Sequence, residues 1–273
     1  MDRSALCDEL RRLPMRDGVA LELLTLLDAP DVSAPRVAQV LGRDAVLAAR
    51  ALHLANSPYF GLGGRVGSLP QAVVLLGFSV IRTLAVSTAA GLFARAGRDV
   101  PDGFWDHSTT VAAGASLIAR HCGTPVGDAF SAGLLHDLGA ALLFRHDRER
   151  YDVVIAAAGE DEGRRTVLER AVFGMDHPEA GALVLRESGL PVWLVDAVAH
   201  HHDDPETMGE PVTRIVWAGE AIAALLVHDD AAVVPRLEAA LAVAGVRDVS
   251  VSTFVETLRA EVGRLEAFVL LGV

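Results

Sequence analysis

Apolar residues recur at helical spacing along most of the chain, and no stretch alternates apolar and polar residues over the length of a strand. Short segments rich in Gly, Pro, Asn, Asp and Ser separate the apolar stretches, and these residue types form turns and end helices. The pattern therefore predicts an all-α fold.

Turn and capping signals set the ends of the predicted helices. Two stretches, Ser68 to Gln71 and Thr253 to Glu256, fit the capping box, in which a Ser or Thr caps a helix and a Gln or Glu bonds back to it. Gly77 is expected to let two helices approach closely. The helices are predicted at 2–28 with a break at 14–18, 34–41, 45–56, 68–93, 104–121, 129–144, 147–158, 164–173, 176–187, 191–200, 213–227 and 253–271.

The polar segment 94–103, which contains Gly and Pro, is the best linker candidate. It suggests an N-terminal helical subdomain, residues 1–95, and a second helical subdomain, residues 96–273. The run Asn56 to Phe60 combines helix-ending residues with two aromatics, so we interpret it as a helix stop in preference to a ligand contact. For residues after about 228 we expect packing or self-association only.

A chain of 273 residues with 51% hydrophobic content can bury a sizeable core. No uninterrupted apolar run reaches membrane-spanning length, and the N-terminus has acids where a signal peptide needs basic and then apolar residues. Cys7 and Cys122 form neither a disulfide framework nor a cysteine-based metal motif. We expect a cytoplasmic protein with no membrane segment.

The formal net charge of −12 disfavours binding to nucleic-acid backbones and anionic membranes. All 24 basic residues are Arg, because the chain contains no Lys. This excludes Schiff-base chemistry and a lysine clamp on phosphate. A nucleic-acid-binding regulator is therefore the least favoured class of function.

An adjacent His136 and Asp137 lie in the middle of the apolar run 129–144, where every polar atom needs a partner. Such a pair can bind one divalent metal, since imidazole nitrogen and carboxylate oxygen suit Zn, Fe or Mn. The simpler interpretation is a core histidine that bonds a carbonyl or the carboxylate. Other histidines lie within or beside predicted helices, at 107, 177 and 200–202, which favours a shared site.

The order His, His-Asp, His, His-His resembles the HD superfamily of metal-dependent phosphohydrolases, whose helices supply ligands to one or two metals. Within that superfamily the chain is most similar to the HDOD family. This resemblance implies an N-terminal helical bundle packed on an HD-like helical bundle, used in bacterial signalling and regulation without dependable catalysis. It covers about residues 20 to 220 and rests on Asp44 to Gly61, Ser68 to Arg82, Phe104 to Ser108, Ala132 to Gly139, Asp176 to Gly181, Leu190-Pro191 and His201-His202.

Two departures from the HD phosphodiesterase pattern count against turnover. The last ligand Asp of that pattern would fall at Gly219, and Glu220 is expected to point elsewhere, because one residue along a helix is a rotation of about 100°. Ala140 stands where the HD-GYP group carries Lys, and the Gly-Tyr-Pro signature is absent after His202. The ligands implied by the resemblance are His107, His136, Asp137, His177, His201 and His202.

We therefore predict a non-catalytic HDOD-type regulatory module with no catalytic residue. Two alternatives are left open for its cofactor: a residual divalent metal site of Zn, Fe or Mn, or none. The alternative function is an active metal-dependent phosphohydrolase or phosphodiesterase. A protein partner in signalling is expected, while a nucleotide ligand and a homo-oligomer are left open. The expected contact surfaces are the loop 56–64 and the groove between the two bundles.

Overall fold

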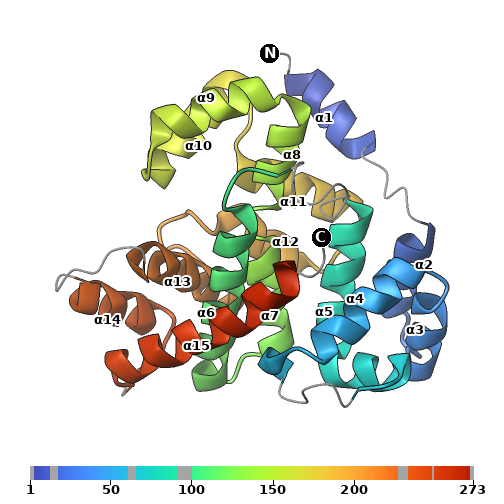
Figure 1. Cartoon of the computed structure of the whole chain (residues 1–273). Coiled ribbons are helices and arrows are strands. Elements are labelled where there is room, and N and C mark those ends of the chain that lie inside the picture. The colour runs from blue at the N-terminus through green and yellow to red at the C-terminus, as the bar shows by residue number, and fades with distance from the viewer. Residues whose placement is uncertain are drawn as a thin grey trace.

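The computed structural model describes residues 3–12, 18–60, 66–90, 100–226, 233–247 and 249–270, and every regular element in them is a helix (Figure 1). This confirms the all-α prediction. In chain order the helices are α1 (Arg3–Arg12), α2 (Gly18–Leu27), α3 (Ala34–Leu41), α4 (Ala45–Ala55), the 3-10 helix η1 (Pro58–Phe60), α5 (Leu69–Ala89), α6 (Phe104–Cys122), α7 (Val126–Leu135), α8 (Leu138–His146), α9 (Arg148–Ala158), α10 (Glu162–Phe173), α11 (His177–Glu187), α12 (Val192–His200), α13 (Pro211–Leu226), α14 (Val233–Val243) and α15 (Val251–Leu270).

Helices α2 to α5 pack together as an N-terminal bundle, and α5 joins this bundle to the second one by packing on α7 (Figure 1). The Ser79 hydroxyl on α5 donates to the Asp128 carboxylate on α7, and Gly127 beside it contacts Ser79. In the second bundle α6 is central, with α7, α13 and α15 around it. The predicted pair of helical bundles is thus confirmed, while the boundary at residues 95 and 96 stays a prediction.

Helix α1 lies apart from the bundle that follows it in sequence and packs on α11 (Figure 1). Arg3 pairs with Glu179 of α11, and Glu9 lies 2.8 Å from His146 at the end of α8. The first helix therefore contacts helices of the second bundle.

Several predicted helix ends are confirmed and three local predictions are wrong. Asp44 caps α4 by accepting from the Val46 and Leu47 N–H groups. Ser68 makes no side-chain cap bond, and Thr253 lies inside α15, donating its N–H to Ser250 Oγ. Gly77 has a φ of +77° and open space at its Cβ position, so it provides a left-handed kink rather than a close helix contact.

Helix α5 is the one helix of the described residues that is long and apolar enough to cross a membrane, which the sequence pattern did not suggest. Its most apolar window is 67% buried inside the protein, as in the core helix of a soluble protein. The predicted cytoplasmic location stays a prediction. Most of the predicted linker, the loop tip at 61–64 and the far ends of three predicted helices, at 91–93, 227 and 271, lie outside the described residues.

Candidate metal centre

The apolar run predicted as one central helix is two helices, and His136 and Asp137 lie at the break between α7 and α8. The His136 Nδ1 lies 2.7 Å from the Gly133 carbonyl, which can only accept, so Nδ1 carries the proton. This bond satisfies a carbonyl at the end of α7 and fixes the ring. Both side chains are buried, and the break lets adjacent residues face the same space.

Two more imidazoles are anchored in the same manner. His201 follows the last residue of α12, and its Nδ1 donates to the Val198 carbonyl at 2.7 Å. His177 begins α11, and Glu169 Oε2 accepts from both its Nδ1 (2.7 Å) and its backbone N–H (2.8 Å). Each of these rings therefore has its Nδ1 proton in use, so in the neutral ring Nε2 presents a bare lone pair.

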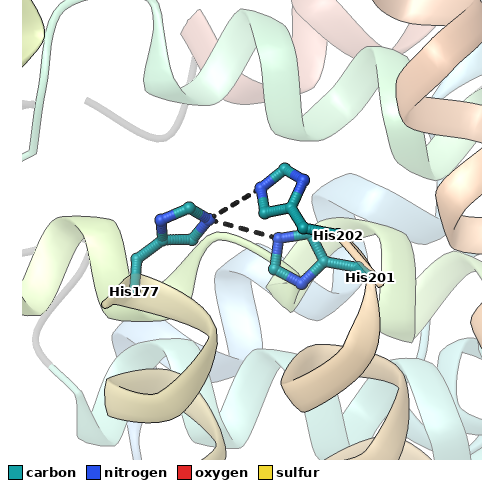
Figure 2. Close-up of side chains that lie close together, drawn as sticks. All are labelled: His177, His201 and His202. Atoms are coloured by element: carbon teal, nitrogen blue, oxygen red, sulfur yellow. Dashed lines mark hydrogen bonds between the residues drawn. The ribbon is translucent and has the colours of Figure 1, made fainter. Parts of the chain in front are cut away.

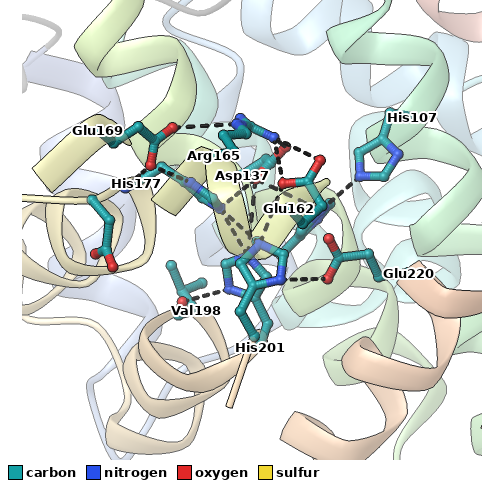
Figure 3. Close-up of polar contacts among 12 residues, drawn as sticks. His107, Asp137, Glu162, Arg165, Glu169, His177, Val198, His201 and Glu220 are labelled. Atoms are coloured by element: carbon teal, nitrogen blue, oxygen red, sulfur yellow. Dashed lines mark hydrogen bonds and ion pairs between the residues drawn. The ribbon is translucent and has the colours of Figure 1, made fainter. Parts of the chain in front are cut away.

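These lone pairs converge on Asp137 Oδ1 (Figure 3). The oxygen lies 3.2 Å from Nε2 of His177 and 3.9 Å from Nε2 of both His136 and His201. The Nε2 atoms of His177 and His201 are 3.3 Å apart, as Figure 2 shows. Asp137 Oδ1 is buried and has no hydrogen-bond partner among the described residues. A cation is the group that would satisfy all four atoms.

Protonation of these histidines or of Asp137 does not relieve the crowding of lone pairs at neutral pH. Burial lowers the pKa of His136 to about 4, and it lowers the pKa values of His177 and His201 well below their usual range. Burial alone would raise the pKa of Asp137, but the Arg165 guanidinium and the neighbouring histidines together outweigh it, and the pKa lies well below the usual range. At neutral pH the centre is a carboxylate surrounded by neutral imidazoles.

His107 and His202 complete the set at its partly exposed side. The Nε2 atom of His107 is 3.1 Å from that of His136, and the Nε2 atom of His202 is 3.0 Å from that of His177. All six residues implied by the resemblance therefore lie together, in groups whose ligand atoms are within 4.8 Å of one another. His200 is different, because its ring is 53% exposed and pairs with Asp203.

The prediction that Glu220 points away from the centre is wrong. A Cβ at Gly219 would lie 3.1 Å from the Val111 carbonyl, so the Gly219 face of α13 rests directly on α6. Glu220 is thereby turned inward, with Oε2 3.6 Å from His202 Nδ1, and a carboxylate oxygen within 4.8 Å of ligand atoms of His136 and His201. Burial, reinforced by nearby carboxylates, raises its pKa well above the usual range.

Ala140 does not supply the cation that Lys provides in the HD-GYP pattern, but Arg165 of α10 brings a cation to the centre. Its Nη1 lies 3.6 Å from Asp137 Oδ2 and 3.0 Å from Glu162 Oε2, and its Nε donates to Glu169 Oε1 at 3.2 Å (Figure 3). Tyr151 donates to the same Glu169 oxygen at 2.8 Å. The sequence predicted this helix at 164–173 but did not assign Arg165 to the centre, although charged residues three and four positions apart on one face were a visible signal.

The unpartnered atoms at the centre are the evidence that these residues fit a divalent metal. An orphaned carboxylate oxygen meets imidazole lone pairs that have no proton to share. The donors are nitrogen and oxygen only, the set that suits Zn, Fe or Mn rather than a thiolate-binding ion.

A model of the HDOD domain matches residues 13–204. The chain belongs to the HDOD family. Glu220 lies beyond the matched residues. Among curated proteins, an uncharacterized protein of Treponema pallidum (strain Nichols) is 24% identical over 213 residues, which are 76% of this chain and 41% of that protein, so the chain spans less than half of that relative.

Two solved structures extend the comparison. A Shewanella amazonensis SB2B protein, whose name assigns it provisionally as a phosphohydrolase, is 27% identical with a TM-score of 0.75 over 97% of this chain and 98% of that one. The MmoQ response regulator of Methylococcus capsulatus str. Bath is 27% identical, with a TM-score of 0.54 over 89% of this chain and 97% of that one. HDOD membership and an HD-type helical fold are therefore shown.

Proposed function

We propose that this protein is an HDOD signalling module that holds a divalent metal ion in its histidine-aspartate centre. One observation carries the proposal: His177 and His201 present their Nε2 atoms to each other at 3.3 Å, beside Asp137 Oδ1, with both Nδ1 protons already donated elsewhere. Two neutral imidazoles in that state repel unless a cation lies between them.

The chain's own residues divide the work of holding the ion. His136, Asp137, His177 and His201 are the buried donors, and His107, His202 and Glu220 are available at the open side. Glu169 orients His177 through its Nδ1 proton, a contact that makes an imidazole a better ligand. A bound divalent cation supplies Lewis acidity at this point.

Metal analysis of the protein purified without an affinity tag tests the proposal. Wild-type protein is expected to retain metal, and His177→Ala is expected to lose it because the ring that faces Asp137 is gone. His200→Ala is the matched control, since this exposed histidine lies outside the cluster and pairs with Asp203. Wild-type protein without metal, or His177→Ala with a full load, would contradict the proposal.

A role in signalling is supported by the family and by the similarity to a response regulator. In such a module the metal serves as a structural or sensory element, and the output passes to a protein partner. The partly exposed His107 and His202 lie at the side of the centre from which a ligand would approach.

Hydrolysis of phosphate esters is the second candidate, and two residues favour it. Gly219 and Ala140 argued against turnover, because they remove a carboxylate and a cation of the HD phosphodiesterase pattern. Glu220 supplies a carboxylate and Arg165 a cation near the centre. Arg165 lines a cavity together with Asp137, and guanidinium is suited to binding a phosphate oxygen. The relative from Shewanella amazonensis carries a phosphohydrolase name.

Turnover of bis(p-nitrophenyl) phosphate with added Mn²⁺ separates the two candidates. Hydrolysis that is lost in Asp137→Asn and kept in His200→Ala would support the enzyme. Metal-loaded protein that leaves this ester and a set of nucleotides intact would support the non-catalytic module.

A further inference from the structure

Two cavities open onto the metal centre and meet at a shared edge. The larger has a volume of about 570 Å³ and the smaller about 370 Å³. His107 and Glu162 line both. The centre therefore has space on two sides of the same pair of side chains.

The larger cavity is lined by His202 and by residues of α13 on both sides of Glu220. Trp217, Ala221 and Ala224 form part of its wall, and their spacing along α13 places an indole beside small side chains. Such a wall suits a planar ring system, which can stack on the indole face.

The smaller cavity reaches Asp137 and Arg165 at its inner end. Phe104, Ile155 and Ala156 give it an apolar wall on the α6 and α9 side. It therefore offers room for a second organic group next to the cation that faces Asp137.

Charge limits what can enter. The exposed carboxylates Glu160, Asp102 and Asp152 line the two cavities, and the chain has a formal net charge of −12. A long polyanion would be repelled by these carboxylates, whereas the N–H groups of a heterocycle could donate to them. The basic residues that line the cavities are Arg236 in the larger and Arg165 in the smaller.

We infer that the centre binds a short phosphodiester, with its single phosphate at the metal and Arg165 and one organic group in each cavity. A dinucleoside monophosphate is the simplest such ligand. A monoester has one organic group and would leave one cavity to water. This inference rests on the proposed metal centre and names the ligand class of that site.

Binding is measured by calorimetry on the Mn²⁺-loaded full chain, with a phosphorothioate-linked diadenosine as the diester probe and adenosine 5′-monophosphate as the monoester probe. Wild-type protein is expected to bind the diester about tenfold more tightly. Ala224→Trp fills the larger cavity and Ile155→Trp the smaller one. Each is expected to weaken diester binding about tenfold, whereas monoester binding falls in only one of the two variants.

Val153→Trp is the matched control, because Val153 is 66% exposed on the same helix as Ile155 and lies outside both cavities. It is expected to bind like the wild type. Circular dichroism and metal content are recorded for every sample, so that loss of folding or of metal is seen directly.

The outcomes separate the two proposals. Metal-loaded wild type that binds diester and monoester equally, or a diester affinity unchanged by both filling variants, overturns the two-cavity ligand and leaves the metal centre standing. A 20-mer oligoadenylate that binds more tightly than the dinucleoside overturns the restriction to short ligands. Wild type without metal overturns the metal centre and this inference with it.

Discussion

At the scale of the residue, Asp137 and Glu220 show how the environment sets the charge of two carboxylates in one buried centre. Burial would raise the pKa of Asp137, but Arg165 and the neighbouring histidines together hold it well below the usual range. The dominant effect on Glu220 is burial, reinforced by repulsion from Asp137, and its pKa is raised well above the usual range. Asp137 therefore ionises first, and Glu220 keeps its proton to a higher pH.

Metal binding is expected to release the Glu220 proton, because a nearby divalent cation favours the ionised carboxylate. Calorimetric titration of Zn²⁺ at pH 6 in buffers of different ionisation enthalpy counts the protons released. Glu220→Gln is expected to release fewer protons than wild type. Glu160→Gln, which changes a carboxylate outside the ligand groups, is the control; equal proton release from all three proteins would contradict this assignment.

The contribution of His136 to the stability of the metal-free protein is expected to fall as the pH drops below about 6.5. The pKa of His136 is about 4 in the folded protein against an ordinary value of 6.5, so the unfolded chain takes up the proton first. Stability from this neutral ring is complete above pH 6.5 and is lost as the pH falls toward 4. The low pKa of Asp137 acts only below pH 3.8, its ordinary value, and leaves this range unaffected.

Urea unfolding at pH 7 and pH 5 with EDTA present measures the effect. His136 alone is expected to cost roughly 2 kcal/mol of unfolding free energy at pH 5, and the lowered pKa values of His177 and His201 act in the same direction. The raised pKa values of Glu162, Glu169 and Glu220 act in the opposite direction, so the comparison with a His136 variant isolates the ring. His136→Asn should show a smaller loss between the two pH values. An equal loss in the variant would show that the ring is not the source.

At the scale of the element, the spacing of α8 and α11 depends on two glycines. A Cβ at Gly139 would lie 1.9 Å from the His177 carbonyl oxygen, and one at Gly181 would lie 3.1 Å from the Gly139 nitrogen. The helices can approach this closely only because neither has a side chain at the contact. Since Asp137 precedes α8 and His177 begins α11, this contact sets the distance between two ligands.

Gly139→Ala is therefore expected to lower the unfolding free energy by about 3 kcal/mol and to remove the metal, because His177 must move. Gly163→Ala is the control: its Cβ would meet only Asp161 Oδ1 at 3.4 Å, so a change of less than about 1 kcal/mol is expected. Urea unfolding and metal content give both readouts. A Gly139→Ala protein as stable and as metal-rich as wild type would rule out this role.

Helix ends were predictable where the signal is local. Asp44 and Asp176 cap α4 and α11 as their sequences indicated, since a cap depends on three or four consecutive residues. The break at His136 was missed, because apolar periodicity continues across it and the turn depends on a histidine bonding its own helix.

At the scale of the whole molecule, the centre collects side chains from α6, the α7–α8 junction, α10, α11, the end of α12 and α13. The histidines and Asp137 could be chosen from the sequence because their order resembles a known family. Glu220 and Arg165 could not, since their direction depends on how α13 rests on α6 and how α10 lies over Asp137. Such packing is set by residues far apart in the chain.

A metal that joins so many helices should stabilise the entire fold. At a free metal concentration of about 100 times Kd the gain is about 2.7 kcal/mol, or roughly 5 to 10 °C in Tm for a chain of this size. Differential scanning fluorimetry with Zn²⁺, and then with excess EDTA, measures the shift and its reversal. His177→Ala should show no Tm shift with Zn²⁺, and His200→Ala should show the full shift. The same Tm shift in both variants would show that the ion binds outside this centre.

The Nδ1 bonds of His136 and His201 to the carbonyls three residues earlier have one more consequence. An arriving ion meets donors that already stand in position, so its entry demands little ordering of the protein. When the ion leaves, the same hydrogen bonds still satisfy carbonyls at the ends of α7 and α12. The protein can thus release and rebind the ion without local unfolding, which is the behaviour that a reversible sensor of an ion requires.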